Sequence, residues 1–267
     1  MTQLTLTVLD ISLTPMTNAP FISFITPVYN EEQNIARMLA NLFAVLNQHP
    51  EWNWEVVLIE DGSRDNTLAV LRNEVPKYSN TCLITHEKNM GYNQSLKDGL
   101  KAARGQYMMY IGADEEFDST EIPNFVEILR KGEADVLLGV RWQRNAYQLF
   151  RFFLSVIYIF LLNWLYKVRI NDYNWSQAWN RKVFEKIELT SHSLFVLPEI
   201  IVKAIDLGFK VKEIPSNHRG RQWGKSSLNM KIMGAALWDS LKFGLLRKSK
   251  KYRPGSDAPF LSSSIST

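Results

Sequence analysis

The chain has 267 residues, of which 46% are hydrophobic and 22% are charged, and this balance excludes an intrinsically disordered or strongly polyelectrolyte protein. Its length fits one α/β domain with additions, because a single hydrophobic core stops growing near roughly 250 to 300 residues. The net charge of +4 favours anionic partners such as phosphates or an acidic lipid surface, but it does not choose among them.

The N-terminal segment has no basic start followed by an apolar stretch, so we expect no signal peptide and predict a flexible N-terminus over residues 1–20. The single cysteine, Cys82, excludes an internal disulfide and a cysteine-rich metal site. Because Cys82 lies in an apolar run, we expect it to be a small buried hydrophobic residue.

Apolar strands alternate with helical patterns through the first half of the chain. The sequence predicts strands at 21–26, 54–59, 82–85 and 107–111, with helices at 31–46, 65–74 and 93–103. Such alternation is typical of an α/β fold with a mostly parallel sheet, right-handed crossovers and flanking helices. In these sheets, ligands bind outside the carboxyl ends of the strands.

Polar residues follow all four predicted strands, at 27–31, 60–63, 86–89 and 112–116. Tyr29 could stack on a base, while Glu31 and Asp61 could accept hydrogen bonds from a base or ribose. Pro27, Lys88 and Ala113 lie at the same strand ends, and we include them in the predicted donor site. Taken singly, each segment could also be an ordinary turn or helix cap.

An acidic segment follows the fourth predicted strand. Asp114, with Glu116 and Asp118, offers the oxygen ligands that Mg²⁺ or Mn²⁺ prefers, and such an ion typically bridges carboxylates and a diphosphate. A solvated acidic loop is the alternative interpretation of the same residues. We predict Asp114 and Glu116 as metal ligands.

The second half begins with a predicted helix at 122–129 and a strand at 135–140. An almost wholly apolar segment follows at 152–166, but as a helix it would span only about 22 Å, short of the roughly 30 Å of a bilayer core. Its aromatic residues and flanking cations favour an amphipathic helix over 151–167 in the membrane surface. A buried or dimer-interface helix is the alternative, and a true membrane span is the least favoured reading.

The remainder predicts a helix at 198–207, a strand at 210–214, a basic glycine-containing loop and a closing amphipathic helix that ends near residue 246. Residues 247–267 begin with lysines and arginine and end in Pro, Gly, Ser and Ala. We therefore predict a disordered tail, whose charges could also touch a membrane surface.

The motifs at the four strand ends together resemble those of the family 2 glycosyltransferases, which have the GT-A fold. The matching segments are P-V-Y-N-E at 27–31, E-D-G-S-R-D-N-T at 60–67, N-M-G at 89–91 and G-A-D at 112–114. The resemblance covers residues 21–246. It implies a nucleotide-sugar half over 21–140 and an acceptor half over 141–246.

Two positions depart from the family pattern. Glu60 replaces the usual first Asp of D-D-G-S but keeps the carboxylate, and Gly112 stands where many relatives have the first Asp of an Asp-x-Asp motif. Glu116 lies where dolichol-phosphate mannose synthases often have Gln. Because Mg²⁺ commonly needs only one or two carboxylates, Asp114 with Glu116 can still serve. An inactive relative is the competing interpretation.

The second half resembles the polyprenyl-phosphate enzymes related to dolichol-phosphate mannose synthase. Their three motifs correspond here to Arg141, to Arg151 with Ser155, and to the Arg-x-x-Gly-x-Ser loop that begins at Arg221. The resemblance implies that Arg141, Arg151 and Ser155 bind the acceptor phosphate. Arg221 would act catalytically with Asp114, by stabilising charge on the leaving diphosphate. Singly, each arginine could instead form a surface salt bridge.

A phosphate acceptor is already anionic, whereas a sugar hydroxyl needs a general base. Glu199 and Asp172 are the acidic candidates of the second half, but Glu199 lies in an apolar helical pattern. Asp172 falls in a segment that matches its relatives only partly, and the segment at 175–179 departs from their small-residue pattern. The sequence therefore favours an acceptor that needs no base.

We predict an inverting, metal-dependent transfer of a hexose from a nucleoside diphosphate sugar, of the GDP-mannose or UDP-glucose type, to a polyprenyl or dolichyl phosphate. The expected location is cytoplasmic, peripherally attached to the membrane, with a homodimer or a membrane-protein partner also open. The alternatives are transfer to a saccharide hydroxyl in surface polysaccharide or lipopolysaccharide assembly, and a non-catalytic nucleotide-sugar-binding module. Nucleic acid is not an expected partner, because the cations are dispersed along the chain.

Overall fold

The computed structural model describes residues 7–9, 19–141, 149–221, 223, 230–249, 252–255 and 259–261, with the side chains of 7–9 and 149–152 left aside. The chain forms two compact units, one of residues 1–122 with 221–225, the other of 123–220 with 226–267. The first boundary between the units falls at residue 122, and in the second unit helix α4 (Ile122–Arg130) packs on strand β6 (Val136–Arg141). A Cβ atom on Gly139 of β6 would lie 3.3 Å from the Phe125 ring of α4.

The N-terminal unit contains a sheet in the order β1-β4-β3-β2-β5. Its parallel strands are β2 (Ile22–Val28), β3 (Trp54–Glu60), β4 (Thr81–Thr85) and β5 (Tyr107–Tyr110). Every residue of β3 is buried, as expected for a strand covered on both faces. The predicted mostly parallel sheet is therefore confirmed.

Strand β1 (Thr7–Leu9) pairs antiparallel with β4, with Val8 opposite Ile84. It lies within the range that we predict to be flexible. The T-V-L segment is short, but its β-branched and apolar residues suit an edge strand, and the exposed edge of β4 supplies its backbone partners.

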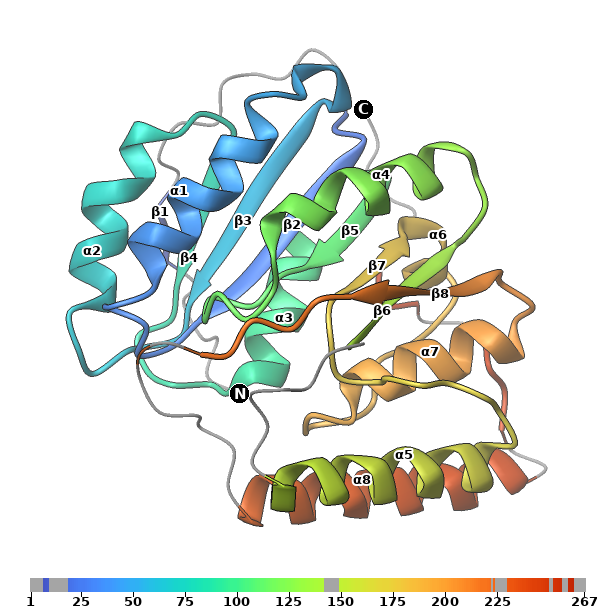
Figure 1. Ribbon diagram of the computed structural model, residues 1–267. Coiled ribbons are helices and arrows are strands. Elements are labelled where there is room, and N and C mark those ends of the chain that lie inside the picture. The colour runs from blue at the N-terminus through green and yellow to red at the C-terminus, as the bar shows by residue number, and fades with distance from the viewer. Residues whose placement is uncertain are drawn as a thin grey trace. The chain divides into compact units, whose positions relative to one another are not determined.

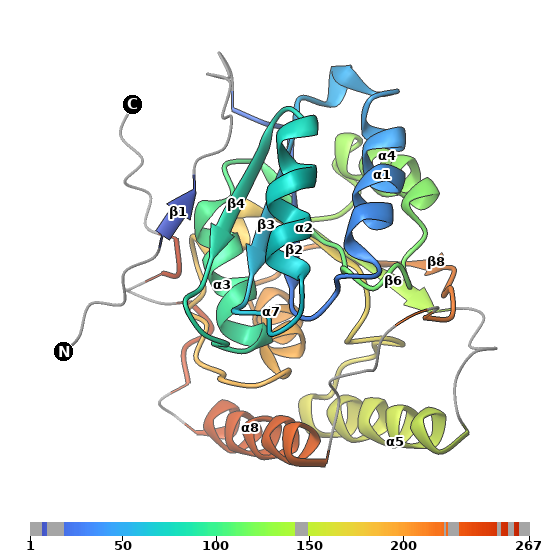
Figure 2. The same cartoon turned by 90° about the vertical axis from the view of Figure 1, so that its left-hand side faces the viewer.

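Helices cover both faces of this sheet (Figure 2). Phe43 of α1 (Ile35–Leu46) contacts Trp54 of β3 with ring centroids 5.6 Å apart, and α2 (Thr67–Glu74) lies against α1. On the other face, α3 (Tyr92–Ala102) comes so close that a Cβ atom on Gly99 would lie 2.5 Å from Ile25. Short 3₁₀ turns occupy Pro50–Trp52, Val75–Lys77 and Ser119–Glu121.

In the C-terminal unit, β6 pairs in parallel with β8 (Val211–Ser216) and antiparallel with β7 (Gln177–Asn180). Helix α6 (Arg181–Phe184) follows β7 directly, and α7 (Val196–Asp206) packs along β8. Neither β7 nor α6 was predicted, since four residues are too few to show a hydrophobic period.

Helices α5 (Leu149–Tyr166) and α8 (Met230–Lys248) lie side by side within the C-terminal unit (Figure 1). The two helices run in the same direction. Ser240 of α8 hydrogen-bonds to Tyr158 of α5, and Gly244, one turn further along α8, lies beside Leu165, further along α5. A Cβ atom on Gly244 would lie 2.8 Å from the Leu165 side chain. Within the described ranges, none of the helices is both long and apolar enough to cross a membrane.

The C-terminal tail is not disordered where the structure describes it. The Tyr252 hydroxyl donates to Asp206 over 2.7 Å, and the backbone N–H groups of Phe260 and Leu261 donate to carbonyls at Ile187 and Phe184. The prediction of disorder was drawn from the basic, Pro, Gly, Ser and Ala residues of this segment. It gave too little weight to aromatic side chains, which dock on the body and fix the backbone around them.

Candidate active site

The loops after β2 and β3 are joined by hydrogen bonds between side chains and backbone. Asn30, with a left-handed φ of 54°, donates from its N–H to Ser63 over 3.0 Å and accepts from the N–H of Arg64 over 2.8 Å. The Thr67 hydroxyl accepts from the N–H of Glu31 over 2.8 Å. The residues of the two motifs therefore build one loop pair in the N-terminal unit.

Asp61 organises the loop that follows β4. Its Oδ1 accepts from the N–H of Met90 and lies 2.8 Å from Nδ1 of His86, while its Oδ2 accepts from the N–H of Gly91 over 2.9 Å. His86 also lies 3.3 Å from Asp98 of α3, and both its carboxylate neighbours are largely buried. The hydrogen bonds to Asp61 and then to Asp98 raise the pKa of His86 to about 9, against the effect of burial.

Gly62 allows the loops after β3 and β4 to touch. Its φ is +61°, and a Cβ atom there would lie 2.4 Å from the backbone of Lys88, so no other residue fits without movement. Lys88 itself is exposed, while Tyr29 and Pro27 are half-buried at the end of β2. The N-terminal unit thus brings the predicted donor residues to one edge of its sheet.

The acidic segment after β5 begins with the buried Ala113. Burial, followed by the nearby charge of Glu116, raises the pKa of the Asp114 carboxyl to about 6. Oδ1 of Asp114 accepts from the N–H of Glu116 over 3.3 Å and would lie 2.9 Å from a Cβ atom on Gly112. The Asp114 carboxylate therefore uses space that a side chain at position 112 would enter.

Arg221 belongs to the N-terminal unit although it lies between the two segments of the C-terminal unit along the chain. Its Nη2 donates to Glu31 over 2.5 Å, and Nδ2 of Asn34 donates to the other Glu31 oxygen over 2.6 Å. Burial still raises the pKa of Glu31, despite the Asn34 hydrogen bond and the Arg221 charge. The charge of Arg221 also opposes the rise in the Asp114 pKa that burial and Glu116 cause.

The predicted metal ligands fit a divalent cation through their electrostatics. Burial first, and then the charge of Glu116, raises the pKa of Asp114, and a cation held by these two carboxylates would offset their repulsion. Among the described residues, no three His, Cys, Asp or Glu side chains come together so as to hold a metal ion. Two carboxylates suffice for Mg²⁺ only if a diphosphate and water complete the shell.

In the C-terminal unit, Arg141 forms a bidentate pair with Asp172. Nε and Nη2 of Arg141 donate to the two Asp172 oxygens over 2.7 and 2.8 Å, and the guanidinium lies 5.0 Å from the centroid of the Trp175 ring. Asp172 is 1% exposed. Arg151 and Ser155 lie on α5, where Ser155 is half-buried and the Arg151 side chain is outside the described part of the chain.

Glu199 is fully buried in α7 and has a structural partner for each oxygen. Oε1 accepts from Lys203 over 2.7 Å and from both the N–H and hydroxyl of Thr190, and Oε2 accepts from the N–H of Ser191. Burial alone would raise the pKa of Glu199, but the Lys203 charge and these hydrogen bonds lower it overall. Glu199 is therefore held as an ion pair and not as a proton acceptor.

Comparison with known proteins agrees with this arrangement. Residues 23–188 match the family described as "Glycosyl transferase family 2", which is more than half of the chain. The chain belongs to glycosyltransferase family 2. The matched range contains the joined loops after β2 and β3 and the acidic segment after β5.

Two relatives and one solved structure are similar to most of the chain. A dodecaprenyl-phosphate galacturonate synthase of Rhizobium johnstonii is 25% identical over 88% of this chain and 69% of its own length. A dolichyl-phosphate beta-glucosyltransferase of Trichomonas vaginalis is 28% identical over 80% and 69%. The glucosyl-3-phosphoglycerate synthase of Mycobacterium tuberculosis, solved with Mn²⁺, uridine diphosphate and phosphoglyceric acid, has a TM-score of 0.62 at 15% identity, covering 85% of this chain and 78% of the other. The last similarity shows the fold.

Sequence reasoning on this glycosyltransferase missed three residues on helix α1 and at its N-cap that reach the candidate site. Asn34, Arg37 and Asn41 contact the segments that contain Arg221 and Asp114. Their spacing of three and four residues places them on one face of a helix, and that pattern was visible in the sequence. A polar helix face normally points to solvent, so the spacing alone did not distinguish them.

Proposed function

We propose that the chain transfers a hexose from a nucleoside diphosphate sugar, of the UDP-glucose or GDP-mannose type, to a polyprenyl phosphate at the cytoplasmic membrane face. The relatives from Rhizobium johnstonii and Trichomonas vaginalis, whose names specify polyprenyl phosphates, support the acceptor. The fold shared with a protein solved with uridine diphosphate and Mn²⁺ supports the donor and the metal.

In this proposal Tyr29 stacks on the base and Glu31 and Asp61 hold the nucleoside, with Pro27, Lys88 and Ala113 lining the donor site. Asp61 acts largely by fixing the loop after β4, because its oxygens already accept from that loop. A divalent cation held by Asp114 and Glu116 supplies positive charge to the diphosphate when bound. Arg221 stabilises the charge that develops on the leaving phosphate oxygen.

The observation that carries the acceptor assignment is helix α5. Its first turns contain Arg151 and Ser155, proposed to bind the phosphate, and its following turns expose apolar side chains that suit a prenyl chain. Phe153, Ile157, Phe160 and Trp164 recur at helical spacing and are between 59% and 71% exposed. One helix thus joins a phosphate-binding start to an apolar face.

The engaged acids of the C-terminal unit favour a phosphate over a sugar hydroxyl. Asp172 is paired with Arg141, and Glu199 is paired with Lys203, so neither candidate base is available to take a proton. A phosphate oxygen attacks the anomeric carbon as an anion and needs no base. Attack opposite the leaving diphosphate inverts the configuration of that carbon.

Helices α5 and α8 together suit a membrane surface. Helix α8 adds exposed apolar residues, including Met230, Trp238 and Leu245, at 69% to 73% exposure. Exposed aromatic and aliphatic side chains on neighbouring helices, next to lysines such as Lys231 and Lys242, are typical of proteins that lie in the headgroup region of an anionic bilayer. We propose that this pair of helices attaches the protein to the membrane.

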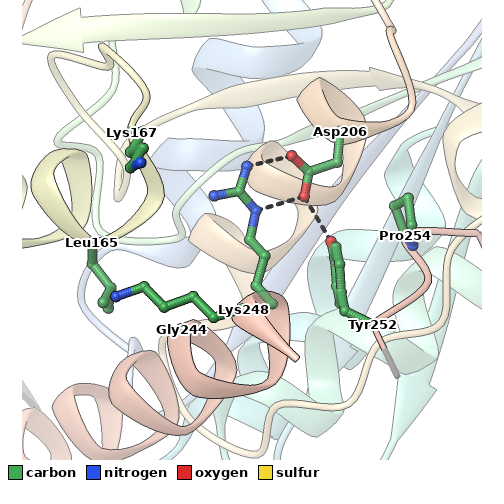
Figure 3. Close-up of a pocket in the computed structure, with 8 residues that line it drawn as sticks. Leu165, Lys167, Asp206, Gly244, Lys248, Tyr252 and Pro254 are labelled. Carbon is green, nitrogen blue, oxygen red and sulfur yellow. Dashed lines mark hydrogen bonds and ion pairs between the residues drawn. The ribbon is translucent and has the colours of Figure 1, made fainter. Parts of the chain in front are cut away.

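A network of hydrogen bonds holds the ends of the two helices (Figure 3). Arg247 of α8 forms a bidentate pair with Asp206 of α7, to which Tyr252 also donates, and a third donor of Arg247 reaches the carbonyl of Tyr166 in α5. The pocket beside these residues has a volume of about 450 Å³. These hydrogen bonds connect α8 to α5 and α7, and they hold the exposed apolar side chains of α5 and α8 in place relative to each other.

The test is a transfer assay with UDP-glucose, UDP-galacturonic acid and GDP-mannose as donors and a polyprenyl phosphate as acceptor, with Mg²⁺, with Mn²⁺ or with a chelator. We expect transfer with one donor, loss with chelator, and retention of the product in the lipid phase. Transfer to a soluble saccharide but to no lipid phosphate would overturn the acceptor. Nucleotide binding without any turnover would support a non-catalytic module instead.

A further inference from the structure

We propose that Arg37 of helix α1 is a positioning residue that clamps Trp223 and thereby holds Arg221 at the donor site. This inference rests on the proposed role of Arg221 and deepens it. All residues of the clamp belong to the N-terminal unit, because residues 221–225 are part of that unit. The ligand held by the positioned Arg221 is the diphosphate of a nucleotide sugar.

The first observation is the double engagement of Arg37. Its guanidinium carbon lies 4.0 Å from the centroid of the Trp223 ring, a close cation–π distance, and its Nε donates to Glu115 in the acidic segment. Asn41, one turn further along α1, donates to the other Glu115 oxygen over 2.7 Å. The hydrogen bond to Glu115 fixes the orientation of the Arg37 guanidinium. The flat face of the guanidinium then lies against the indole ring of Trp223.

The second observation is the connection from Trp223 back to Arg221. The carbonyl of Trp223 accepts from Nε of Arg221 over 2.9 Å and from Nδ2 of Asn34 over 3.3 Å. Arg221 in turn donates to Glu31, which Asn34 also contacts. A displaced Trp223 would therefore remove a carbonyl that orients the Arg221 guanidinium.

Burial does not explain the position of Trp223. Its side chain is 41% exposed, so the hydrophobic effect holds it less strongly than a core tryptophan. Glu115 adopts a left-handed φ of 58°, a conformation that a non-glycine residue adopts at a cost, and its carboxylate meets both Arg37 and Asn41. Specific polar contacts thus hold both partners of Arg37.

The clamp is tested with Arg37→Met, which keeps the length of the side chain and removes its charge, and with Arg37→Lys, which keeps the charge without the planar fork. Arg72→Met on α2 is the matched control, because Arg72 is exposed and its replacement changes the net charge equally. Three readouts are needed: kcat/KM for transfer, the affinity for the nucleoside diphosphate by calorimetry, and the rate of tryptic cleavage after Arg221.

For Arg37→Met we expect kcat/KM to fall about 10-fold and cleavage after Arg221 to accelerate by a similar factor, since one such contact contributes roughly that much to an equilibrium. Arg37→Lys should recover part of both, and Arg72→Met should match the parent. In the double variant with Trp223→Leu, the effects should not multiply, because both changes release the same clamp.

Parent-like cleavage and kcat/KM in Arg37→Met would overturn the clamp, as would effects that multiply in the double variant. A circular dichroism melt shows whether each variant is folded. If Arg37→Met does not fold, the comparison is made between Arg37→Lys and the parent. If the parent transfers to no acceptor, the proposed function fails, but tryptic cleavage and nucleotide affinity still decide on the clamp.

Discussion

His86 offers a direct test of the electrostatics beneath the proposed donor site. It lies between Asp61 and Asp98 with its side chain 4% exposed, and the hydrogen bonds to these carboxylates raise its pKa to about 9. Replacing it by Gln keeps a donor but removes the titration. We predict that His86→Gln removes a specific part of the dependence of stability on pH.

The size and sign follow from the shift. The pKa of His86 rises from 6.5 to about 9, and at 1.36 kcal/mol for each pH unit this corresponds to about 3 kcal/mol. Because the folded pKa is the higher one, the stabilisation is complete below pH 6.5 and is lost as the pH rises through 9. The lowered pKa of Asp98 reports the same interaction and is not added.

The assay is urea unfolding at pH 6, 7.5 and 9, with His49→Gln as the control. His49 is more exposed and pairs with Glu51 at the surface, so its replacement removes an imidazole without changing the contacts of His86 with Asp61 and Asp98. The parent should lose about 2 to 3 kcal/mol between pH 6 and 9, and His86→Gln should lose much less. Parallel decreases in parent and His86→Gln would refute a charged His86 in the folded protein.

The remaining predictions concern the reaction, the acceptor region and the membrane. Asp114→Ala should abolish transfer more completely than Glu116→Ala in a kcat measurement, and full activity of Asp114→Ala would refute the assigned site. Arg141→Met should lower the unfolding free energy by about 3 kcal/mol in urea, because it removes the bidentate guanidinium partner of the buried Asp172 carboxylate. Phe160→Ser with Trp164→Ser should weaken sedimentation with anionic vesicles at least roughly 10-fold without changing the melting temperature, since both side chains are exposed.

Local periodicity was sufficient to predict most of the N-terminal unit. The predicted strand at 54–59 became β3 and the predicted helix at 93–103 became α3 with shifts of about one residue. Each of these elements shows its period within a single window, and tertiary contacts reinforce it. The edge where the strands end could also be predicted, because a parallel sheet brings those ends together.

Contacts between distant residues could not be predicted in the same way. Asp61 was expected to face the nucleoside, but its hydrogen bonds to His86, Met90 and Gly91 depend on how two loops meet in space. Arg37 reaches Trp223 across 186 positions of sequence, and no local pattern contains that pairing. The sequence shows which residues could form hydrogen bonds or ring contacts, whereas the fold determines which of them meet.

For Gly112, the sequence pattern and the contacts in the fold have to be considered together. From the sequence it was a lost metal ligand, since many relatives have Asp at that position. The structure adds that a Cβ atom at 112 would lie 2.9 Å from Oδ1 of Asp114, so the glycine gives the Asp114 carboxylate its place. Burial and the charge of Glu116 raise the pKa of Asp114, which means that they disfavour its ionised form. A bound cation would favour the ionised form again. In the proposed metal site, the missing Asp at 112 and the position of Asp114 are therefore one feature, and Asp114 with Glu116 takes the place of the usual Asp-x-Asp pair.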